Sequence, residues 1–193
     1  MFVAKPDAAP ADTDLVYARP DDITDSGESW RTVLQEYNAT PGTNPLGLLP
    51  AWQLYRNPTY RILTDHCGTE RLYILSAGWG LIRADYLTPS YDITFSRGSK
   101  VELFKRRDRR EAFEDFSLAA GTEEAIVFFG GRDYIPLFCR LTANAQGSRT
   151  IFYVGNTPSQ DVAPGCTLRK YERRFTNWHY QCAKRYVADR LQM

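Results

Sequence analysis

Three short and almost continuous apolar runs constrain the fold more than any other feature of the sequence. They are RLYILSA at 71–77, AIVFFGG at 125–131 and RTIFYVGN at 149–156, and a shorter run, DLVYA, precedes them at 14–18. Continuous rather than alternating hydrophobicity is typical of strands covered on both faces, and helical spacing between such strands indicates parallel crossovers. We therefore expect a three-layer α/β domain with a mostly parallel central sheet of about four strands flanked by helices.

Helical spacing of apolar residues predicts the elements between and after these strands. Ser29 is a candidate N-cap for the first helix, and Gly68 suits the left-handed end of the third. The Ala- and Pro-rich start, residues 1–13, is expected to form a mobile arm or part of a sheet edge. The whole chain is expected to be one domain that closes with a basic C-terminal helix within 166–193. The expected helices are 29–38, 49–57, 59–68, 99–119, 133–145 and 168–192.

The composition excludes several classes of protein. Twenty-four Lys and Arg oppose 23 Asp and Glu, so the net charge of +1 does not by itself indicate a nucleic-acid partner. Four dispersed cysteines and two histidines lack zinc-site spacing, and we expect neither a metal nor a cofactor. The sequence shows no apolar run long enough for a signal peptide or a membrane span, so a cytoplasmic protein without a membrane partner is the expectation.

The loops that follow the four predicted strands are the expected place for a ligand. In open α/β sheets the binding crevice lies outside the carboxyl ends of the strands. These loops read RPDD at 19–22, SAGWGL at 76–81, GGRDY at 130–134 and GNTPSQ at 155–160. None matches the phosphate loop GxxxxGK[ST] or the dinucleotide fingerprint GxGxxG, which disfavours nucleotide hydrolysis and nicotinamide binding.

The second of these loops places Trp79 between two glycines. Gly78 and Gly80 allow a ligand to approach the backbone closely, and the indole can present an aromatic face. The alternative is a tight turn whose tryptophan folds back onto the core. Further along, Asp92 points away from Tyr91 on an extended segment, where it can act as a base at a pocket rim or cap a following helix.

The other loops supply cationic and polar candidates. Arg132 lies at a predicted helix start, where it can strengthen the attraction of an anion, although Asp133 can serve there as a plain N-cap. The C-terminal segment interleaves basic and aromatic side chains, the two ingredients of nucleic-acid contact, although the aromatics also fit a core-facing stripe. The candidate phosphate or DNA contacts are Arg19, Gly131, Arg132, Tyr134, Arg169, Lys170, Arg173 and Arg174.

The stretch YILSAGWGLIRADYLTPSYDITF, residues 73–95, resembles the signature of a bacterial family related to the YaaA peroxide-stress proteins. Leu75–Ala77 match the end of the family's strand, Gly80 and Leu81 its turn, and Pro89, Tyr91 and Asp92 its extended part. Trp79 replaces the basic residue usual before the turn. The resemblance implies an α/β domain associated with DNA, similar to the uracil-DNA glycosylase type of fold, with an anti-phage DNA glycosylase among the activities it allows.

These features lead to a functional hypothesis. We expect an enzyme acting on DNA bases, a glycosylase that flips a modified base, such as a modified cytosine of phage DNA, into the crevice. Asp92, or else Asp21 or Asp22, would activate water or stabilise the positive charge on the sugar. Two alternatives remain: a non-enzymatic DNA-binding protein of the YaaA type, and an enzyme acting on free nucleosides. The residues expected to hold the base are Ser76, Gly78, Trp79, Tyr91 and Asn156.

Overall fold

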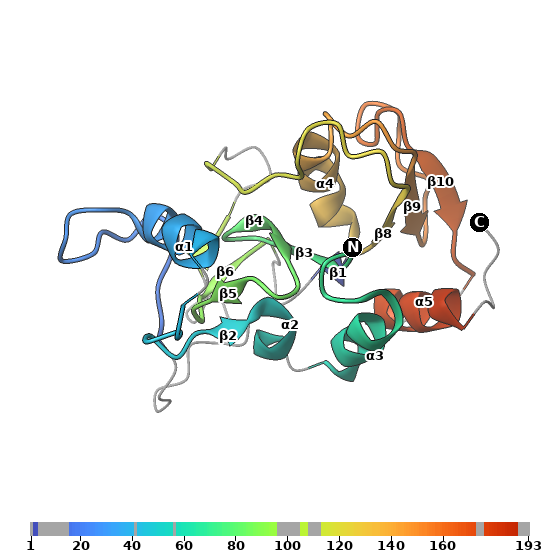
Figure 1. Cartoon of the computed structure of the whole chain (residues 1–193). Coiled ribbons are helices and arrows are strands. Elements are labelled where there is room, and N and C mark those ends of the chain that lie inside the picture. The colour runs from blue at the N-terminus through green and yellow to red at the C-terminus, as the bar shows by residue number, and fades with distance from the viewer. Residues whose placement is uncertain are drawn as a thin grey trace.

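A six-stranded mixed sheet forms the centre of the molecule in the computed structural model (Figure 1). The structure describes residues 2–3, 16–40, 42–55, 57–95, 105–107, 113–172 and 176–188. The strand order is β10-β9-β8-β1-β3-β4. All neighbouring pairs are parallel except β3 and β4, which form an antiparallel hairpin at one edge. The chain is therefore a mixed α/β protein, as its apolar runs predict.

The strands of this sheet are short. β3 (Tyr73–Ser76), β8 (Ile126–Phe129) and β9 (Arg149–Tyr153) coincide with the three apolar runs, and each contains buried residues. The remaining strands of the sheet are β1 (Phe2–Val3), β4 (Gly80–Arg83) and β10 (Thr167–Lys170). Because β1, β3, β8, β9 and β10 run in the same direction, their carboxyl ends lie along one edge of the sheet.

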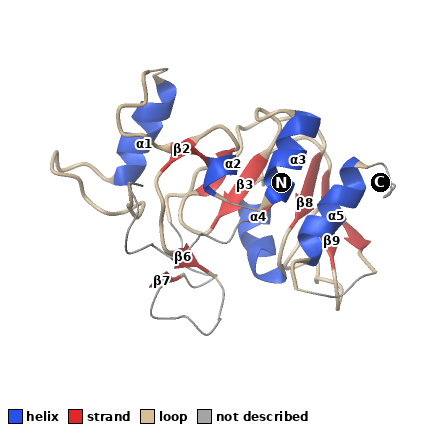
Figure 2. Cartoon of the chain, turned by 90° about the horizontal axis from the view of Figure 1, so that it is seen from below, coloured by secondary structure: helices blue, strands red, loops and turns tan. Residues whose placement is uncertain are grey.

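Helices cover the sheet on both sides in Figure 1, with α4 (Ile135–Leu141) on one side and α3 (Pro58–Cys67) and α5 (Trp178–Val187) on the other. α3 and α5 pack against each other, as the view from below also shows (Figure 2). The N-cap of α3 is Asn57, whose side chain accepts from the Thr59 amide at 3.0 Å. None of the helices in the described part of the chain is long and apolar enough to span a membrane.

Two helices, two small two-stranded sheets and a 3₁₀ helix complete the fold in the described part of the chain. Ser29 is the N-cap of α1 (Trp30–Ala39), as expected, and a short helix, α2 (Ala51–Leu54), follows β2 (Leu49–Pro50). β2 pairs antiparallel with β5 (Leu87–Thr88), and β6 (Ile93–Thr94) pairs parallel with β7 (Lys105–Arg106). A short 3₁₀ helix at Arg132–Tyr134 leads into α4.

Two expectations about the N-terminal half are wrong. Residues 2 and 3 form neither a mobile arm nor a sheet edge, because β1 lies inside the sheet between β8 and β3. The run at 14–18 does not supply a strand of this sheet; of its described residues, Tyr17 makes one isolated bridge to Ser90. A two-residue strand in a Pro-rich segment carries no periodic signal, whereas an isolated apolar run looks like a strand whether or not it has neighbours.

The expected helices are confirmed in part. Those at 29–38 and 59–68 correspond to α1 and α3, and those at 49–57 and 133–145 are shorter than expected. The helix expected at 99–119 is wrong where the structure describes it, because 105–106 form β7 and 113–119 are not helical. The C-terminal helix begins only at Trp178, since Thr167–Lys170 pair with β9 as β10. The remaining parts of both segments lie outside the described residues.

Candidate functional site

The candidate site is built on the turn that joins β3 to β4 at the carboxyl end of β3. Ser76 pairs with Gly80 across the hairpin, so residues 77–79 form the turn. The Ser76 hydroxyl accepts from the amides of Gly78 and Trp79 at 3.1 and 3.0 Å and donates to the Tyr91 hydroxyl at 2.6 Å. Satisfying two buried amides with one side chain fixes the turn.

The glycines of the turn are required by its packing. A Cβ on Gly78 would lie 3.0 Å from Cδ2 of Tyr91. Gly80 has a φ of +84°, and a Cβ there would lie 2.6 Å from Cβ of Asp115 and 2.7 Å from the Phe116 carbonyl oxygen. The glycines therefore allow the Tyr91 ring and the segment at 115–116 to approach the backbone of the turn. The sequence indicates such a close approach, but the approaching groups belong to the protein itself and not to a ligand.

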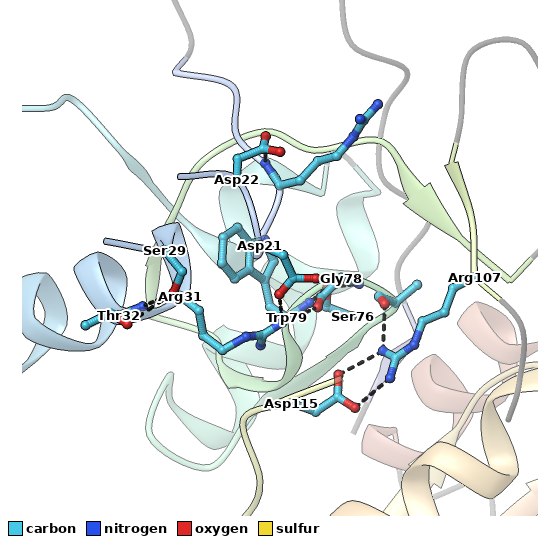
Figure 3. Close-up of polar contacts among 12 residues, drawn as sticks. Asp21, Asp22, Ser29, Arg31, Thr32, Ser76, Gly78, Trp79, Arg107 and Asp115 are labelled. Carbon is cyan, nitrogen blue, oxygen red and sulfur yellow. Dashed lines mark hydrogen bonds and ion pairs between the residues drawn. The ribbon is translucent and has the colours of Figure 1, made fainter. Parts of the chain in front are cut away.

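Two buried arginines hold the turn from opposite sides, as Figure 3 shows. Arg107 donates to the Ala77 carbonyl at 2.9 Å, and Nη2 of Arg31, from α1, lies 3.5 Å from the Gly78 carbonyl. Their side chains are 0% and 5% exposed. The turn thus presents its carbonyls inward to fixed positive charge.

The two arginines differ in how their charges are balanced. Both terminal nitrogens of Arg107 bond Asp115, at 2.8 and 2.7 Å, and Arg140 donates to the same carboxylate at 2.6 Å. Among the described residues, the one carboxylate paired with Arg31 is that of Asp21, which is 3.5 Å away and 62% exposed. Nε and Nη1 of Arg31 find no partner among the described residues. Arg31 is therefore a buried cation with incomplete compensation, which is rare in a stable core.

Asp92 forms the second part of the site. Arg19 donates to both of its oxygens, from Nε at 2.7 Å and from Nη2 at 2.6 Å. The Asp92 side chain is 8% exposed, whereas that of Arg19 is 39% exposed. Burial would raise the pKa of Asp92, but the hydrogen bonds from Arg19 and Tyr17 outweigh it and hold the pKa below its usual value of 3.8. The site therefore contains a largely buried carboxylate that stays ionised.

The neighbouring tyrosines are neutral donors and acceptors. Tyr91, next to Asp92, bonds the Tyr55 hydroxyl as well as Ser76. Burial raises the pKa of Tyr91 to about 12, although its hydrogen bonds with Ser76 and Tyr55 oppose the rise. Burial, followed by the Asp92 carboxylate, raises the pKa of Tyr17 to about 12. These phenols keep their protons at neutral pH.

The indole of Trp79 does not face an open crevice. It is 0% exposed, stacks on Phe116 at a ring distance of 6.4 Å and meets the edge of Tyr91 at 6.2 Å. The turn is an antiparallel hairpin rather than a strand-to-helix connection, so its tryptophan folds onto the core. This arrangement is the alternative left open by the sequence, and stacking of Trp79 or Tyr91 on a ligand would require the packing to open.

The other expected site residues lie at several places. Arg132 and Asn156 are exposed in the loops after β8 and β9, on the same sheet edge as Ser76, with Gly131 partly exposed and Tyr134 buried against Phe95. Asp21 and Asp22 are exposed before α1, and Asp22 accepts from the Arg19 amide. Arg169 and Lys170 are exposed on β10; Arg173 and Arg174 lie outside the described residues. The structure brings Tyr91 against Ser76 and Gly78 at the turn, and it pairs Arg19 with Asp92, the residue after Tyr91.

Sequence reasoning missed Arg31, Arg107 and Asp115. Arg31 lies in the amphipathic pattern of α1, and Arg107 lies in KRRDRR, a run that reads as a solvated helical face. Nothing in these patterns indicates that two of the cations are buried. A signal was available only in the aromatic residues that surround them: the Arg107 guanidinium lies 3.8 Å from the centroid of Phe113, and that of Arg31 lies 5.6 Å from Phe116.

The described residues contain no group of three or more His, Cys, Asp and Glu side chains placed to hold a metal ion. Comparison with known proteins adds no relative: no protein-family model matches the chain, and no match was found among curated proteins or among solved structures.

Proposed function

We propose that this chain is a DNA glycosylase that hydrolyses the N-glycosidic bond of a flipped, modified base, such as a modified cytosine in phage DNA. The observation that carries the proposal is Asp92, a carboxylate that is 8% exposed yet kept ionised next to Tyr91, whose hydroxyl bonds Ser76. A fixed negative charge is what the oxocarbenium-like transition state of glycosidic cleavage needs.

The proposed reaction uses one carboxylate. The C1′–N bond breaks, its electron pair leaves with the base, and water adds to C1′ while Asp92 takes the water's proton. Arg19 is 39% exposed, so a DNA phosphate can compete for its guanidinium and release the carboxylate toward the sugar. Arg132, Arg169 and Lys170 are exposed at the same edge of the sheet and would hold further phosphates.

We also propose that the fold has three layers. A three-layer arrangement, with the sheet between α4 and the α3–α5 pair, would place the site at the carboxyl edge where open α/β sheets bind ligands. Cytoplasmic residence would fit the four free cysteines.

The test is release of free base from a duplex that carries a modified cytosine, followed by detection of the abasic site. We expect Asp92→Asn to lower the rate by about 10²- to 10⁴-fold, the range for a group acting in proton transfer. Asp65→Asn is the matched control, because Asp65 is 73% exposed on α3 and lies outside the site. Base release by Asp92→Asn at the rate of the Asp65→Asn control would overturn the assignment.

A second function, a DNA-binding protein without catalysis, is favoured by a separate observation. Trp79 and Tyr91 are fully buried, and Asp92 is engaged by Arg19 in a closed ion pair. In this proposal Arg19, Arg132, Arg169 and Lys170 bind phosphates, and the turn only supports them.

The two functions separate in a single pair of measurements. Both predict that DNA affinity falls with rising salt, and that Arg132→Ala weakens binding. Only the glycosylase predicts abasic sites. Salt-dependent binding with no base release from any modified duplex would favour the binding protein, and absence of both would reject the two proposals together.

A further inference from the structure

A cleft separate from the carboxyl-edge site lies between α1 and the hairpin of β3 and β4. Its volume is about 930 Å³, at the upper end of the range for small-molecule sites, roughly 300 to 1,000 Å³. One wall comes from α1 and the loop after it, and the other from β4 and the segment at 116–119. Four aromatic rings line it: Tyr37, Tyr73, Tyr86 and Phe116. It contains none of the residues expected to act on the base.

The cleft runs along the free edge of β4. The Leu81 amide donates to the Phe116 carbonyl at 2.7 Å, so the backbone N–H and C=O groups of Leu81 point away from β3. In an antiparallel ladder the outward groups recur at every second residue, and therefore the Arg83 amide also points outward. Leu81, Ile82 and Arg83 all line the cleft.

One donor and one acceptor remain open on this edge. Among the described residues, neither the Leu81 carbonyl nor the Arg83 amide has a hydrogen-bond partner. On one side the edge is closed by Phe116, which bonds Trp79 and Leu81; on the other the Arg83 carbonyl accepts from the Tyr86 amide at 3.0 Å. The segment that would continue the ladder turns away, because the Leu118 amide bonds Leu141 instead.

The short length of the open edge decides what it can bind. An extended peptide that adds to a sheet needs a row of free backbone groups on the edge strand. A ligand with a single amide group needs only one backbone carbonyl and one backbone N–H. Tyr86 and Phe116, with ring centroids 5.4 Å apart, provide apolar surface beside this pair. A flat ring that carries an N–H next to a C=O satisfies both features.

Arg31 adds an electrostatic preference. Its guanidinium lies 5.6 Å from the centroid of Phe116, behind the wall of the cleft, and is only weakly paired with Asp21. A buried cation whose Nε and Nη1 have no partner in the described part of the chain makes the adjacent space favourable for electron-rich carbonyl groups.

We propose that this cleft binds a planar cyclic amide of the nucleobase class, with its N–H donated to the Leu81 carbonyl and its C=O accepting from the Arg83 amide. The ligand is either a free nucleoside or a base extruded from DNA, which offer the same edge. Binding in this cleft does not require glycosidic cleavage, so this proposal can be tested independently of the proposed function.

Thymidine and deoxyguanosine are the probes, since both carry an N–H beside a C=O. Binding is measured by calorimetry or saturation-transfer NMR, with N3-methylthymidine as the matched ligand that lacks the donor. We expect N3-methylation to weaken binding at least about tenfold, because it leaves the Leu81 carbonyl unpaired. An eight-residue oligothymidylate, measured in parallel, distinguishes a free nucleoside from a base within DNA.

The protein variants separate the backbone amide from the side chain. Arg83→Pro removes the outward N–H, which takes no part in the ladder with β3, and proline is accepted on an edge strand in that position. Arg83→Ala is its control, because it removes the exposed ion pair with Asp85 and keeps the amide. Ser117→Trp, at an exposed lining position, fills the cleft independently, with Gln160→Trp as an exposed control elsewhere.

The expected result is binding of at least one probe, weakened about tenfold in Arg83→Pro relative to Arg83→Ala and abolished in Ser117→Trp. If Arg83→Pro fails to fold, Ser117→Trp with its control Gln160→Trp, together with N3-methylthymidine, still tests the proposal. Three outcomes overturn the proposal: no binding of either nucleoside or the oligonucleotide, equal binding of N3-methylthymidine, or binding unchanged by Ser117→Trp.

Discussion

Arg19 and Asp92, which are 73 residues apart, form a two-point ion pair with bonds of 2.7 and 2.6 Å. The pair fastens the segment before α1 to the segment after β5, and it is reinforced by the backbone bond between Ala18 and Ser90. Two residues that sequence reasoning assigned to separate roles, phosphate contact and catalysis, therefore control each other's availability. Any ligand that attracts the guanidinium changes the environment of the carboxylate.

Asp92→Asn is expected to destabilise the fold at neutral pH by about 2 kcal/mol, a value below that of a fully buried pair because Arg19 is partly exposed. The pKa of Asp92 is lower in the folded state than its usual 3.8, so its stabilising effect is complete above that pH and is lost as the pH falls through the lowered pKa. The difference between wild type and variant should therefore shrink below pH 3.8 in urea unfolding.

Asp85→Asn is the control for this measurement. Asp85 forms an equally short bond with Arg83, 2.6 Å, but both side chains are more than a third exposed. Exposed pairs contribute roughly 0 to 1 kcal/mol, so we expect a small effect. Equal losses in the two variants would show that burial does not strengthen the Arg19–Asp92 pair.

Gly80→Ala is expected to cost more than about 2 kcal/mol, through a left-handed φ of +84° and a Cβ that would lie 2.6 Å from Asp115. Gly131→Ala is the matched change, because its φ is −67° and nothing lies within 4 Å of its Cβ position. It should alter the free energy of unfolding by less than about 0.5 kcal/mol. Similar values for the two variants would contradict the packing of the turn.

Ser76→Ala tests the hydrogen bonds that fix the turn. The change leaves the amides of Gly78 and Trp79 buried without their acceptor, and we expect a loss of about 2 to 4 kcal/mol in chemical denaturation. Ser159→Ala, at an exposed loop position, should be near neutral. Near-UV circular dichroism offers a second readout, because Trp79 is packed against Phe116 and Tyr91 only while the turn holds.

Much of the sheet and of the helical layers follows from local patterns. The runs at 71–77, 125–131 and 149–156 become β3, β8 and β9 because their residues are buried from both sides, and the caps Ser29 and Gly68 mark helix ends correctly. The hairpin was not predictable in the same way. SAGWGL fits both a strand-to-helix turn and a tight antiparallel return, and the choice depends on Phe116, which lies 36 or more residues later and pairs with Gly80.

The site shows a similar division. Ser76 and Gly78 lie at one turn, and Tyr91, 15 residues after Ser76 and next to Asp92, bonds Ser76, so their closeness in sequence already suggests a common site. The partners Arg19, Arg31 and Arg107 come from distant segments, and burial of an arginine depends on tertiary neighbours rather than on local spacing. Local composition therefore identifies the turn but not the cations that hold it.

Arg31 and Arg107 provide the sharpest contrast, because both are buried and both donate toward a carbonyl of the same turn. Replacing Arg107 by Met leaves the Asp115 carboxylate, 1% exposed, with Arg140 as its one cationic partner among the described residues, so we expect a loss of about 3 to 5 kcal/mol. Replacing Arg31 by Met removes a cation whose contacts are 3.5 Å long and whose Nε and Nη1 are unpartnered among the described residues. That change should be neutral or stabilising by roughly 1 kcal/mol, because an apolar side chain of similar volume avoids the desolvation cost. Thermal and urea unfolding of the two variants check the contrast, and a loss for Arg31→Met as large as that for Arg107→Met would show that Arg31 is well compensated in the native state.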